Sequence, residues 1–168
     1  MSDPVVEFTT SHGTFVIALD PARAPATVEN FLAYVDARHY DGTVFHRVIP
    51  TFMVQGGGFD QQLEKRPVRA PIQNEATNGL KNTRGTVAMA RTSDPHSATA
   101  QFFVNVVDNA SLDHQAPSGP GWGYCVFGRV IEGMDIVDKI RNEPTGSVGP
   151  FAKDAPLKTV TITQARRR

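Results

Sequence analysis

Hydrophobic residues occur in short runs along this chain, and most of the runs are bounded by Gly, Pro, Asn or Asp. Short runs that contain β-branched and aromatic residues predict β-strands rather than helices. Ser11-His12-Gly13 joins the first two runs as a hairpin turn, and Asp41-Gly42 supplies a turn before the third. We predict strands at residues 5–8, 14–19, 43–49, 86–90, 102–106, 126–130 and 157–163, and a further short strand that starts at Phe52.

Two segments have helical periodicity instead. The first begins near Pro25, which a helix tolerates in its first turn, and carries apolar residues at helical spacing: Val28, Phe31, Leu32 and Val35. The second, residues 133–141, places three apolar residues on one face: Met134, Val137 and Ile140. Many short strands with only two helices indicate an antiparallel all-β fold, and this pattern leaves both a barrel and a sandwich open.

The segments between these elements contain no repeat, no low-complexity tract and no linker. Residues 61–81 and 108–123 are interrupted by prolines and predict long ordered loops, and residues 91–100 form a shorter connection. We therefore expect one domain that spans residues 1–168, with a core of about 5–164 and short tails at both ends.

Composition narrows the class of protein. The 168 residues contain 17 Lys and Arg against 17 Asp and Glu, so the chain lacks the basic excess of a general nucleic-acid binder. Only Arg166-Arg167-Arg168 is locally basic, and we interpret it as a solvated tail. No apolar run reaches membrane-span length and no secretory signal is present, so we expect no membrane contact and a cytoplasmic protein. Cys125, the single cysteine, cannot form an intramolecular disulfide and is expected to be a small buried hydrophobe.

The stretch from Phe45 to Gly57 places a cation and an amide in an otherwise apolar, strand-like sequence. Strict alternation from Thr43 sends Phe45, Arg47 and Ile49 to one face. The opposite face then carries Val44, His46 and Val48, and we interpret His46 as a structural histidine. An arginine among Phe, Met and Gln is costly to bury unless it serves a function. Aromatic and thioether walls around a few polar groups are typical of a small binding pocket.

This stretch, Phe-His-Arg-Val-Ile-x-x-Phe-Met-x-Gln-Gly-Gly, resembles the core motif of the cyclophilins, the peptidyl-prolyl cis–trans isomerases. A second block, Gln101-Phe102-Phe103, follows in the order and spacing of that family. The resemblance covers about residues 5–164 and implies a closed eight-stranded antiparallel barrel with a helix capping each end. Further segments resemble the bacterial cytoplasmic subgroup, namely Asn74-Glu75-Ala76 and the residues at 95–100 and 121–127.

The resemblance also implies roles for particular residues. Arg47, Gln55 and Phe103 would be catalytic, with Arg47 stabilising the twisted amide within an apolar proline pocket. The substrate-binding residues would be Phe52, Met53, Ala90, Arg91, Gln101, Leu112 and Tyr124. Since rotation about a peptide bond breaks no covalent bond, we expect no cofactor and no metal. The five histidines lack paired ligand spacing. Gly56-Gly57-Gly58 is not followed by the Gly-Lys-Ser/Thr ending of a phosphate loop, and we expect these glycines to form a tight turn.

Three positions depart from the family pattern. Ser111 occupies a position where many members have a tryptophan that hydrogen-bonds cyclosporin, so we expect weak or reduced cyclosporin binding. Tyr124 replaces a common histidine; it keeps an aromatic wall and a hydroxyl but does not titrate near neutral pH. Arg91 replaces a common asparagine, and this swap should be tolerated if the family holds the peptide through the backbone at that position.

The sequence therefore predicts an isomerase that acts on X-Pro bonds in unfolded or flexible chains and assists folding. The alternative is a proline-peptide binding or chaperone module without relevant turnover. A hydrolase is a third reading, and Ser93, Asp94 and His96 form no credible triad for it. We expect a monomer, because a closed barrel has no free sheet edge.

Overall fold

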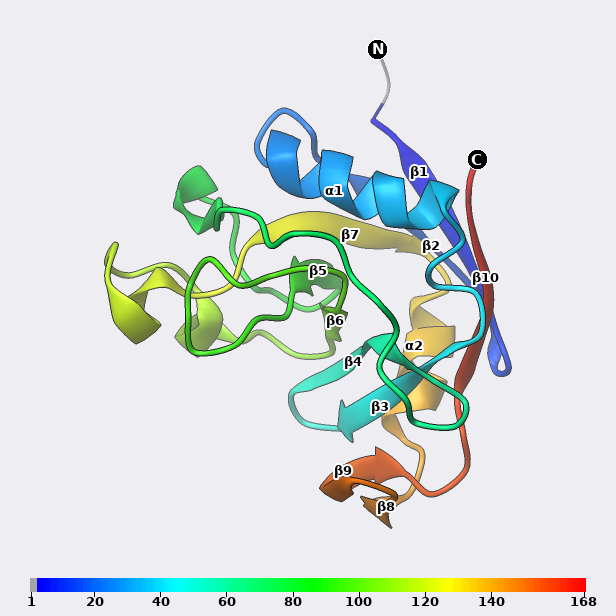
Figure 1. The fold of residues 1–168 in the computed structure, drawn as a ribbon. Coiled ribbons are helices and arrows are strands. Elements are labelled where there is room, and N and C mark those ends of the chain that lie inside the picture. The colour runs from blue at the N-terminus through cyan, green and yellow to red at the C-terminus, as the bar shows by residue number, and fades with distance from the viewer. Residues whose placement is uncertain (1–2) are drawn as a thin grey trace.

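The strands of the chain close into one antiparallel barrel, as the computed structural model of residues 3–168 shows (Figure 1). The order around the barrel is β1-β10-β3-β4-β6-β5-β7-β2. The predicted eight-stranded barrel is confirmed. Its strands are β1 (Val5–Thr10), β2 (Gly13–Leu19), β3 (Thr43–Ile49), β4 (Met53–Asp60), β5 (Thr86–Met89), β6 (Phe102–Asn105), β7 (Val126–Glu132) and β10 (Thr161–Arg167).

Both predicted helices are present, and in Figure 1 the blue one lies above the barrel and the orange one lies beside β3 and β4. They are α1 (Pro25–Asp36), which has Pro25 in its first turn, and α2 (Met134–Arg141). Three short 3-10 helices interrupt the long loops: η1 (Ala76–Asn78), η2 (Ala110–Leu112) and η3 (Gly119–Trp122). No helix within residues 3–168 is long and apolar enough to cross a membrane.

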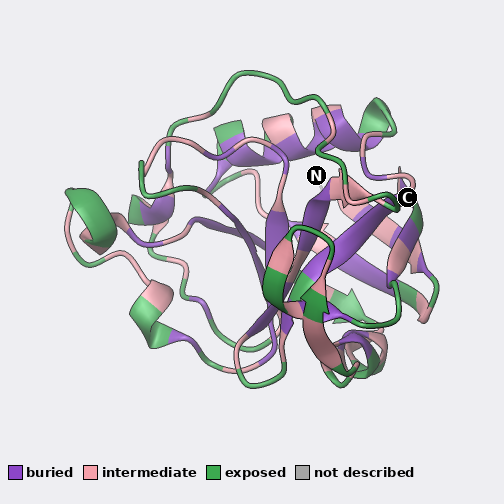
Figure 2. Ribbon diagram, turned by 60° about the horizontal axis from the view of Figure 1, so that its bottom comes forward, coloured by how far each residue is buried: buried purple, intermediate pink, exposed green. Residues whose placement is uncertain are grey.

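Aromatic side chains fill the barrel interior. The buried residues, purple in Figure 2, lie along the barrel strands and along the helix that covers them. Phe8 stacks on Phe15 with ring centroids 5.1 Å apart, and Phe31 of α1 meets Phe102 of β6 edge-on at 5.8 Å. Each fully buried side chain of this size contributes about 1.5–3 kcal/mol relative to an exposed one. The apolar stripe of α1 is therefore what holds this helix over the end of the barrel.

A second, smaller apolar cluster lies on the outer surface of the barrel wall. Successive residues of a strand face opposite sides, so Phe102 enters the interior while Phe103 faces outward. The buried members of this outer cluster come from β4, β5, β6, β7 and the residue after β5: Met53, Ala88, Ala90, Phe103 and Val126. The closed wall thus carries a buried apolar patch outside the core.

The predicted alternation within residues 43–49 is wrong. The pairing of β3 with β4 shifts register between Thr43 and Phe45 and again between Phe45 and Arg47. Phe45 and Val48 both pack in the barrel core, whereas Arg47 is exposed. Such β-bulges change which face the following residues occupy, and a period-2 pattern cannot represent them. His46 is buried outside the core against Phe59 and Phe151, and its Nδ1 has no hydrogen-bond partner within residues 3–168.

The closing strand lies later than predicted. β10 runs from Thr161 to Arg167 instead of 157–163, and a separate hairpin of β8 (Thr145–Val148) and β9 (Phe151–Pro156) precedes it. The interpretation of the terminal arginines as a solvated tail holds only in part. Arg167 and Arg168 are exposed, but Arg166 and Arg167 belong to β10 and all three arginines form ion pairs with distant elements. The pairs are Arg166–Asp41 at 2.8 Å, Arg167–Asp36 at 2.7 Å, and Arg168 with Glu7 at 3.1 Å and Glu132 at 2.8 Å. Their partners lie far away in the sequence, where local patterns do not show them.

The three glycines after Gln55 lie within β4 and not in the tight turn that we predicted. A Cβ atom on Gly56 would approach the carbonyl oxygen of Val44 to 2.8 Å, and one on Gly58 would lie 2.5 Å from the side chain of Gln101. Gly57 has a φ of 92°, which a residue with a side chain rarely adopts. These glycines therefore allow β3 and Gln101 to pack closely against β4.

Cys125, the residue before β7, is buried, as predicted. Its sulfur lies 3.6 Å from the hydroxyl of Thr27. Burial raises the pKa of the Cys125 thiol to about 11, so the thiol is protonated at neutral pH. This agrees with a small hydrophobe and not with a reactive thiolate.

Candidate active site

The predicted site residues gather around one cavity of about 320 Å³ over the outer apolar cluster. This volume falls within the range of small-molecule and peptide side-chain pockets. Nine of the ten predicted residues line it: Arg47, Phe52, Met53, Gln55, Ala90, Arg91, Phe103, Leu112 and Tyr124. The tenth, Gln101, lies beside the cavity and accepts a hydrogen bond from Gln55.

The floor of the cavity is apolar and rigidly placed. Met53 and Phe103 are 2% and 3% exposed and come from the adjacent strands β4 and β6. Phe103 meets Tyr124 edge-on, with ring centroids 5.6 Å apart. Leu112 of η2 covers one side, and its carbonyl oxygen accepts a hydrogen bond of 2.8 Å from the backbone N–H of Tyr124. An apolar ring of about the size of proline fits such a floor.

One edge of the cavity is polar. Arg47 and Gln55 are directly opposite in the β3–β4 ladder, and Arg47 Nη1 donates to Gln55 Oε1 at 3.4 Å. Gln55 Nε2 in turn donates to Gln101 Oε1 at 3.0 Å. The side chain of Arg47 is exposed, and no carboxylate within residues 3–168 lies within 4.0 Å of its guanidinium. Its remaining N–H groups are therefore available to a ligand.

The opposite edge is formed by Arg91 and Tyr124. The guanidinium carbon of Arg91 lies 4.5 Å from the centre of the Tyr124 ring, in a cation–π arrangement. Arg91 Nε donates to the carbonyl oxygen of Gly123 at 3.0 Å, and Nη1 donates to that of Thr92 at 2.8 Å. The sequence led us to expect a contribution from the backbone of Arg91, whereas its side chain also lines the cavity.

Comparison with known proteins identifies the family. The model of cyclophilin-type peptidyl-prolyl cis-trans isomerases matches residues 5–167. The chain belongs to this family. Among curated cyclophilin relatives, peptidyl-prolyl cis-trans isomerase cyp18 of Streptomyces antibioticus is 58% identical over 161 residues, which are 96% of this chain and 96% of the relative. Peptidyl-prolyl cis-trans isomerase B of Escherichia coli K12 is 54% identical over 158 residues, 94% and 96% of the two chains.

Solved structures show the same fold. The crystal structure of a cyclophilin-type isomerase from Cryptosporidium parvum aligns with a TM-score of 0.79 at 23% identity, and the alignment covers 99% of this chain and 98% of the other. A second structure of that protein, obtained in the presence of the dipeptide Ala-Pro, aligns with a TM-score of 0.78. The chain is thus a cyclophilin in fold and an isomerase by family.

Sequence reasoning missed three asparagines that hold the loops of this cyclophilin around the cavity. Asn109 Nδ2 donates to the carbonyl oxygen of Phe52 at 2.9 Å and to Asn105 Oδ1 at 2.8 Å. Asn105 Nδ2 donates to Asn82 Oδ1 at 3.0 Å, and Asn82 Nδ2 reaches the carbonyl oxygen of Leu112 at 3.2 Å. The sequence did contain a signal for this network. Asn105 interrupts the apolar run 102–106, and a buried amide needs hydrogen-bond partners.

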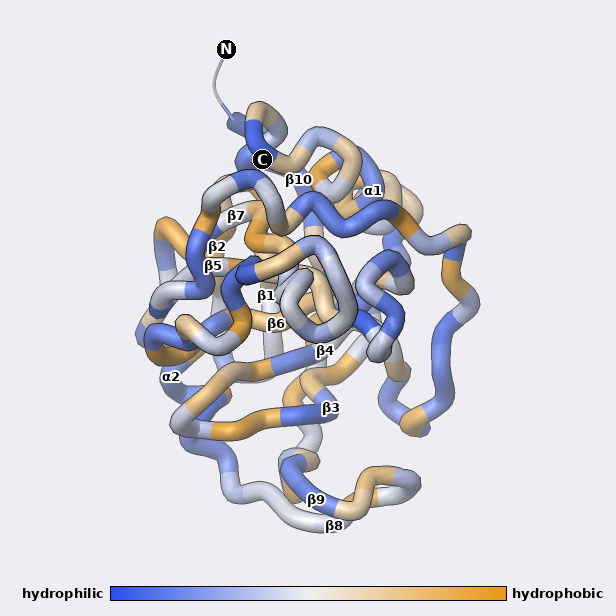
Figure 3. Tube along the Cα trace, turned by 90° about the vertical axis from the view of Figure 1, so that its left-hand side faces the viewer, coloured by the Kyte–Doolittle hydropathy of each residue, from blue (hydrophilic) through white to orange (hydrophobic). Residues whose placement is uncertain are grey.

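Long loops around the cavity leave the barrel on one side, which Figure 3 views directly. They connect β5 with β6 and β6 with β7, and they include η2 and η3. Tyr124, Leu112 and Arg91 lie on or next to these loops, whereas Arg47, Met53 and Phe103 lie on strands. The cavity therefore combines a strand-borne floor with a rim formed by loops.

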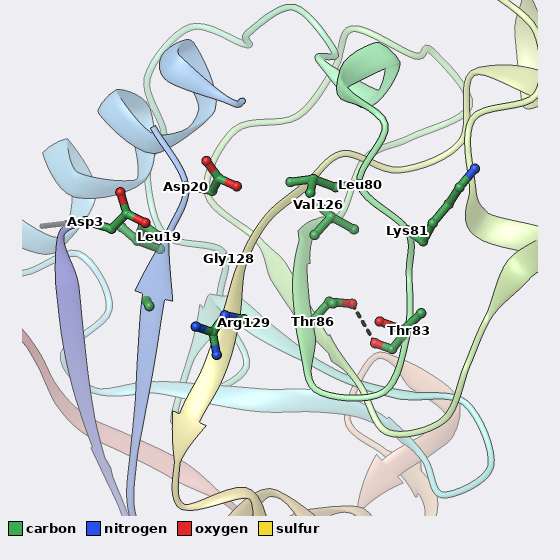
Figure 4. Close-up of a pocket in the computed structure, with 11 residues that line it drawn as sticks. Asp3, Leu19, Asp20, Leu80, Lys81, Thr83, Thr86, Val126, Gly128 and Arg129 are labelled. Carbon is green, nitrogen blue, oxygen red and sulfur yellow. Dashed lines mark hydrogen bonds between the residues drawn. The ribbon is translucent and has the colours of Figure 1, made fainter. Parts of the chain in front are cut away.

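A separate cavity of about 240 Å³ lies beside β2, β5 and β7 (Figure 4). Charged side chains from different elements surround it, including Asp20, Lys81 and Arg129. The hydroxyl of Thr86 at its edge donates to the carbonyl oxygen of Thr83 at 2.7 Å. None of the predicted site residues lines this cavity, so we place the candidate active site at the Arg47 cavity.

The described part of the chain, residues 3–168, contains no group of three or more His, Cys, Asp or Glu side chains arranged to hold a metal ion. His46, next to Arg47 in sequence, does not face the cavity; burial, and to a lesser extent the charge of Arg47, lowers its pKa to about 4. The groups that the cavity offers a ligand are thus guanidinium and amide N–H donors, amide oxygens and apolar walls.

Proposed function

We propose that this cyclophilin accelerates rotation about X-Pro bonds in unfolded or flexible chain segments, and that Arg47 stabilises the twisted amide. The observation that carries the proposal is the exposed guanidinium of Arg47 at the edge of a cavity whose floor, formed by Met53 and Phe103, is apolar. No other lining residue combines a permanent charge with several available N–H donors on the strand side of the cavity.

The chemistry follows from the nature of the barrier. Amide resonance sets a barrier of about 18–20 kcal/mol, and in the twisted state the prolyl nitrogen becomes pyramidal and gains an available lone pair. A guanidinium N–H can donate to this lone pair, and the planar substrate offers no equivalent acceptor. An interaction that exists only in the transition state raises the rate and not the affinity.

The neighbours of Arg47 support the same role. Gln55 accepts a hydrogen bond from the guanidinium and donates one to Gln101. The three side chains at the polar edge are therefore connected by hydrogen bonds. Met53 and Phe103 would receive the proline ring and exclude water from the rotating bond. Exclusion of water strengthens the hydrogen bond from Arg47.

The test is two-dimensional exchange NMR of a short X-Pro peptide with wild-type protein, Arg47→Ala and Arg47→Lys. We expect Arg47→Ala to lower kcat/KM by at least about 100-fold while peptide affinity changes by less than about threefold. Arg47→Lys should recover little, because lysine lacks the planar fork. Arg129→Ala is the matched control, since Arg129 is an exposed strand arginine outside the cavity.

The same experiment addresses the alternative of a binding module. Peptide chemical-shift changes without faster exchange in the wild type would favour a proline-peptide binding or chaperone module. Equal exchange rates in wild type and Arg47→Ala would leave an isomerase but remove Arg47 from its mechanism.

We also propose assistance of protein folding and weak cyclosporin binding. Unfolded chains expose X-Pro bonds whose slow exchange limits folding, so they are natural substrates for this site. Ser111 is an exposed residue of η2 and has no indole N–H to donate to cyclosporin. Calorimetric titration should show that Ser111→Trp binds cyclosporin about tenfold more tightly than wild type. Equal affinities would remove Ser111 as the cause.

A further inference from the structure

A second cavity of about 510 Å³ adjoins the Arg47 cavity, where we propose that proline binds. The two cavities share two lining residues, Arg91 and Tyr124. The stacked pair of Arg91 and Tyr124 is therefore the wall between the two cavities. Consecutive Cα atoms of a peptide are 3.8 Å apart, so a proline in the first cavity presents a neighbouring side chain to the second. The side chain of a residue next to proline can therefore occupy the second cavity.

The lining of the second cavity carries several hydroxyl groups. Besides the shared pair it contains Pro120 and three hydroxyl-bearing residues: Thr92, Ser93 and Ser111. Thr92 Oγ1 is engaged with Ser97 at 2.8 Å, whereas the hydroxyls of Ser93 and Ser111 make no hydrogen bond within residues 3–168. Ser93 and Ser111 can therefore donate to an acceptor placed in this cavity.

Arg91 supplies the charge. A guanidinium carries five N–H donors, and the contacts to Gly123 and Thr92 use two of them, which leaves three. No carboxylate within the described residues 3–168 lies within 4.0 Å of the Arg91 guanidinium. Asp94, in the adjoining loop, uses Oδ1 to accept from the backbone N–H of His96 at 2.9 Å. The second cavity thus combines a stacked, orientated cation with free hydroxyls.

We propose that Arg91 makes this isomerase select substrates with an Asp or Glu side chain next to the proline, and that the carboxylate binds in the second cavity. This inference rests on the proposed function. A carboxylate accepts two parallel N–H bonds from a guanidinium, and the hydroxyls of Ser93 and Ser111 can complete its coordination. Arg47, the other cation at the proline cavity, adds to the attraction of acidic peptides.

The test compares turnover of four peptides by exchange NMR: Ala-Glu-Pro-Ala and Ala-Pro-Glu-Ala, each with a matched Gln peptide. Uncatalysed rates are subtracted. At one of the two positions, before or after proline, we expect kcat/KM to be about threefold to fivefold higher for Glu than for Gln. A partly exposed ion pair contributes an effect of this magnitude. The ratio should decrease toward one at about 1 M NaCl, because salt screens exposed charges.

Variants assign the effect to Arg91. In Arg91→Gln, the ratio of kcat/KM for the Glu peptide to that for the Gln peptide should be about one. Both values are measured with the same variant, so a change in its overall activity does not affect the ratio. Arg129→Gln removes an exposed arginine at the separate cavity of Figure 4 and should keep the wild-type ratio. A wild-type ratio of one at both positions, or an unchanged ratio in Arg91→Gln, overturns the inference. If no peptide exchanges faster with enzyme, the proposed isomerase function fails instead.

Discussion

Phe102 and Phe103 are adjacent in β6 and lie on opposite sides of the barrel wall. Phe102 is fully buried in the interior, where its ring lies 5.4 Å from that of Phe8, whereas Phe103 forms part of the floor of the Arg47 cavity. One peptide unit therefore separates a residue of the core from a residue of the site.

This relationship predicts opposite effects for the same substitution. Phe102→Leu should lower the free energy of unfolding by about 1–2 kcal/mol, because the interior is tightly packed, and leave turnover per folded molecule nearly unchanged. Phe103→Leu should cost less stability and lower kcat/KM by about tenfold, since the floor loses its ring. Urea unfolding and exchange NMR on both variants check this. Equal effects of the two substitutions on turnover would contradict it.

Gln55 connects Arg47 to Gln101, so its removal should affect catalysis more than stability. Gln55→Met keeps the length of the side chain and loses both hydrogen bonds. We expect kcat/KM to decrease by about tenfold, because the guanidinium loses its orientation, with less than about 1 kcal/mol lost in stability. Gln164→Met on β10, at an exposed position remote from the cavity, is the control. Wild-type turnover in Gln55→Met would show that Gln55 does not position Arg47.

Asn105 is fully buried at the centre of the asparagine network, where it contacts Asn82, Thr86 and Asn109. Asn105→Leu has similar volume but leaves buried polar partners unsatisfied, which should lower the free energy of unfolding by about 2–4 kcal/mol. Because the network holds Phe52 and Leu112, KM for a peptide should also rise. Asn142→Leu, at an exposed position, should change stability by less than about 0.5 kcal/mol. A loss that small in Asn105→Leu would mean that the network contributes little.

His46 makes stability dependent on pH. Its pKa is lowered from 6.5 to about 4, first by burial and then by the charge of Arg47. The unfolded state therefore binds a proton at a higher pH than the folded state. The contribution of neutral His46 to the free energy of unfolding is fully present above about pH 6.5 and is lost as pH falls through about 4. The loss attributable to His46 amounts to about 3 kcal/mol.

His46→Phe removes the titrating group and keeps a ring against Phe59 and Phe151. The difference in unfolding free energy between variant and wild type should grow in favour of the variant as pH falls from about 7 to about 4. Denaturant melts at several pH values measure this difference. Parallel curves would show that His46 is not held neutral by the fold.

The sequence alone determined much of the fold and of the site. Helical spacing in α1 and α2 and the apolar strand runs are local signals, and the barrel itself followed from the family resemblance. The motif around Arg47 and the Gln101-Phe102-Phe103 block indicated ten residues that the structure brings to one cavity. Residue type and spacing are sufficient there because the family motif fixes which side chains stand at which positions.

Only the tertiary structure decided how the elements meet. The bulges in β3 placed Arg47 outside and Phe45 inside, and a bulge depends on the partner strand and not on the local pattern. Pairing with β1 moved the closing strand to Thr161–Arg167 and engaged Arg166 with Asp41. The Arg91–Tyr124 wall likewise joins segments far apart in the sequence. Such contacts join residues that are far apart in the sequence, so no periodic pattern along the chain predicts them.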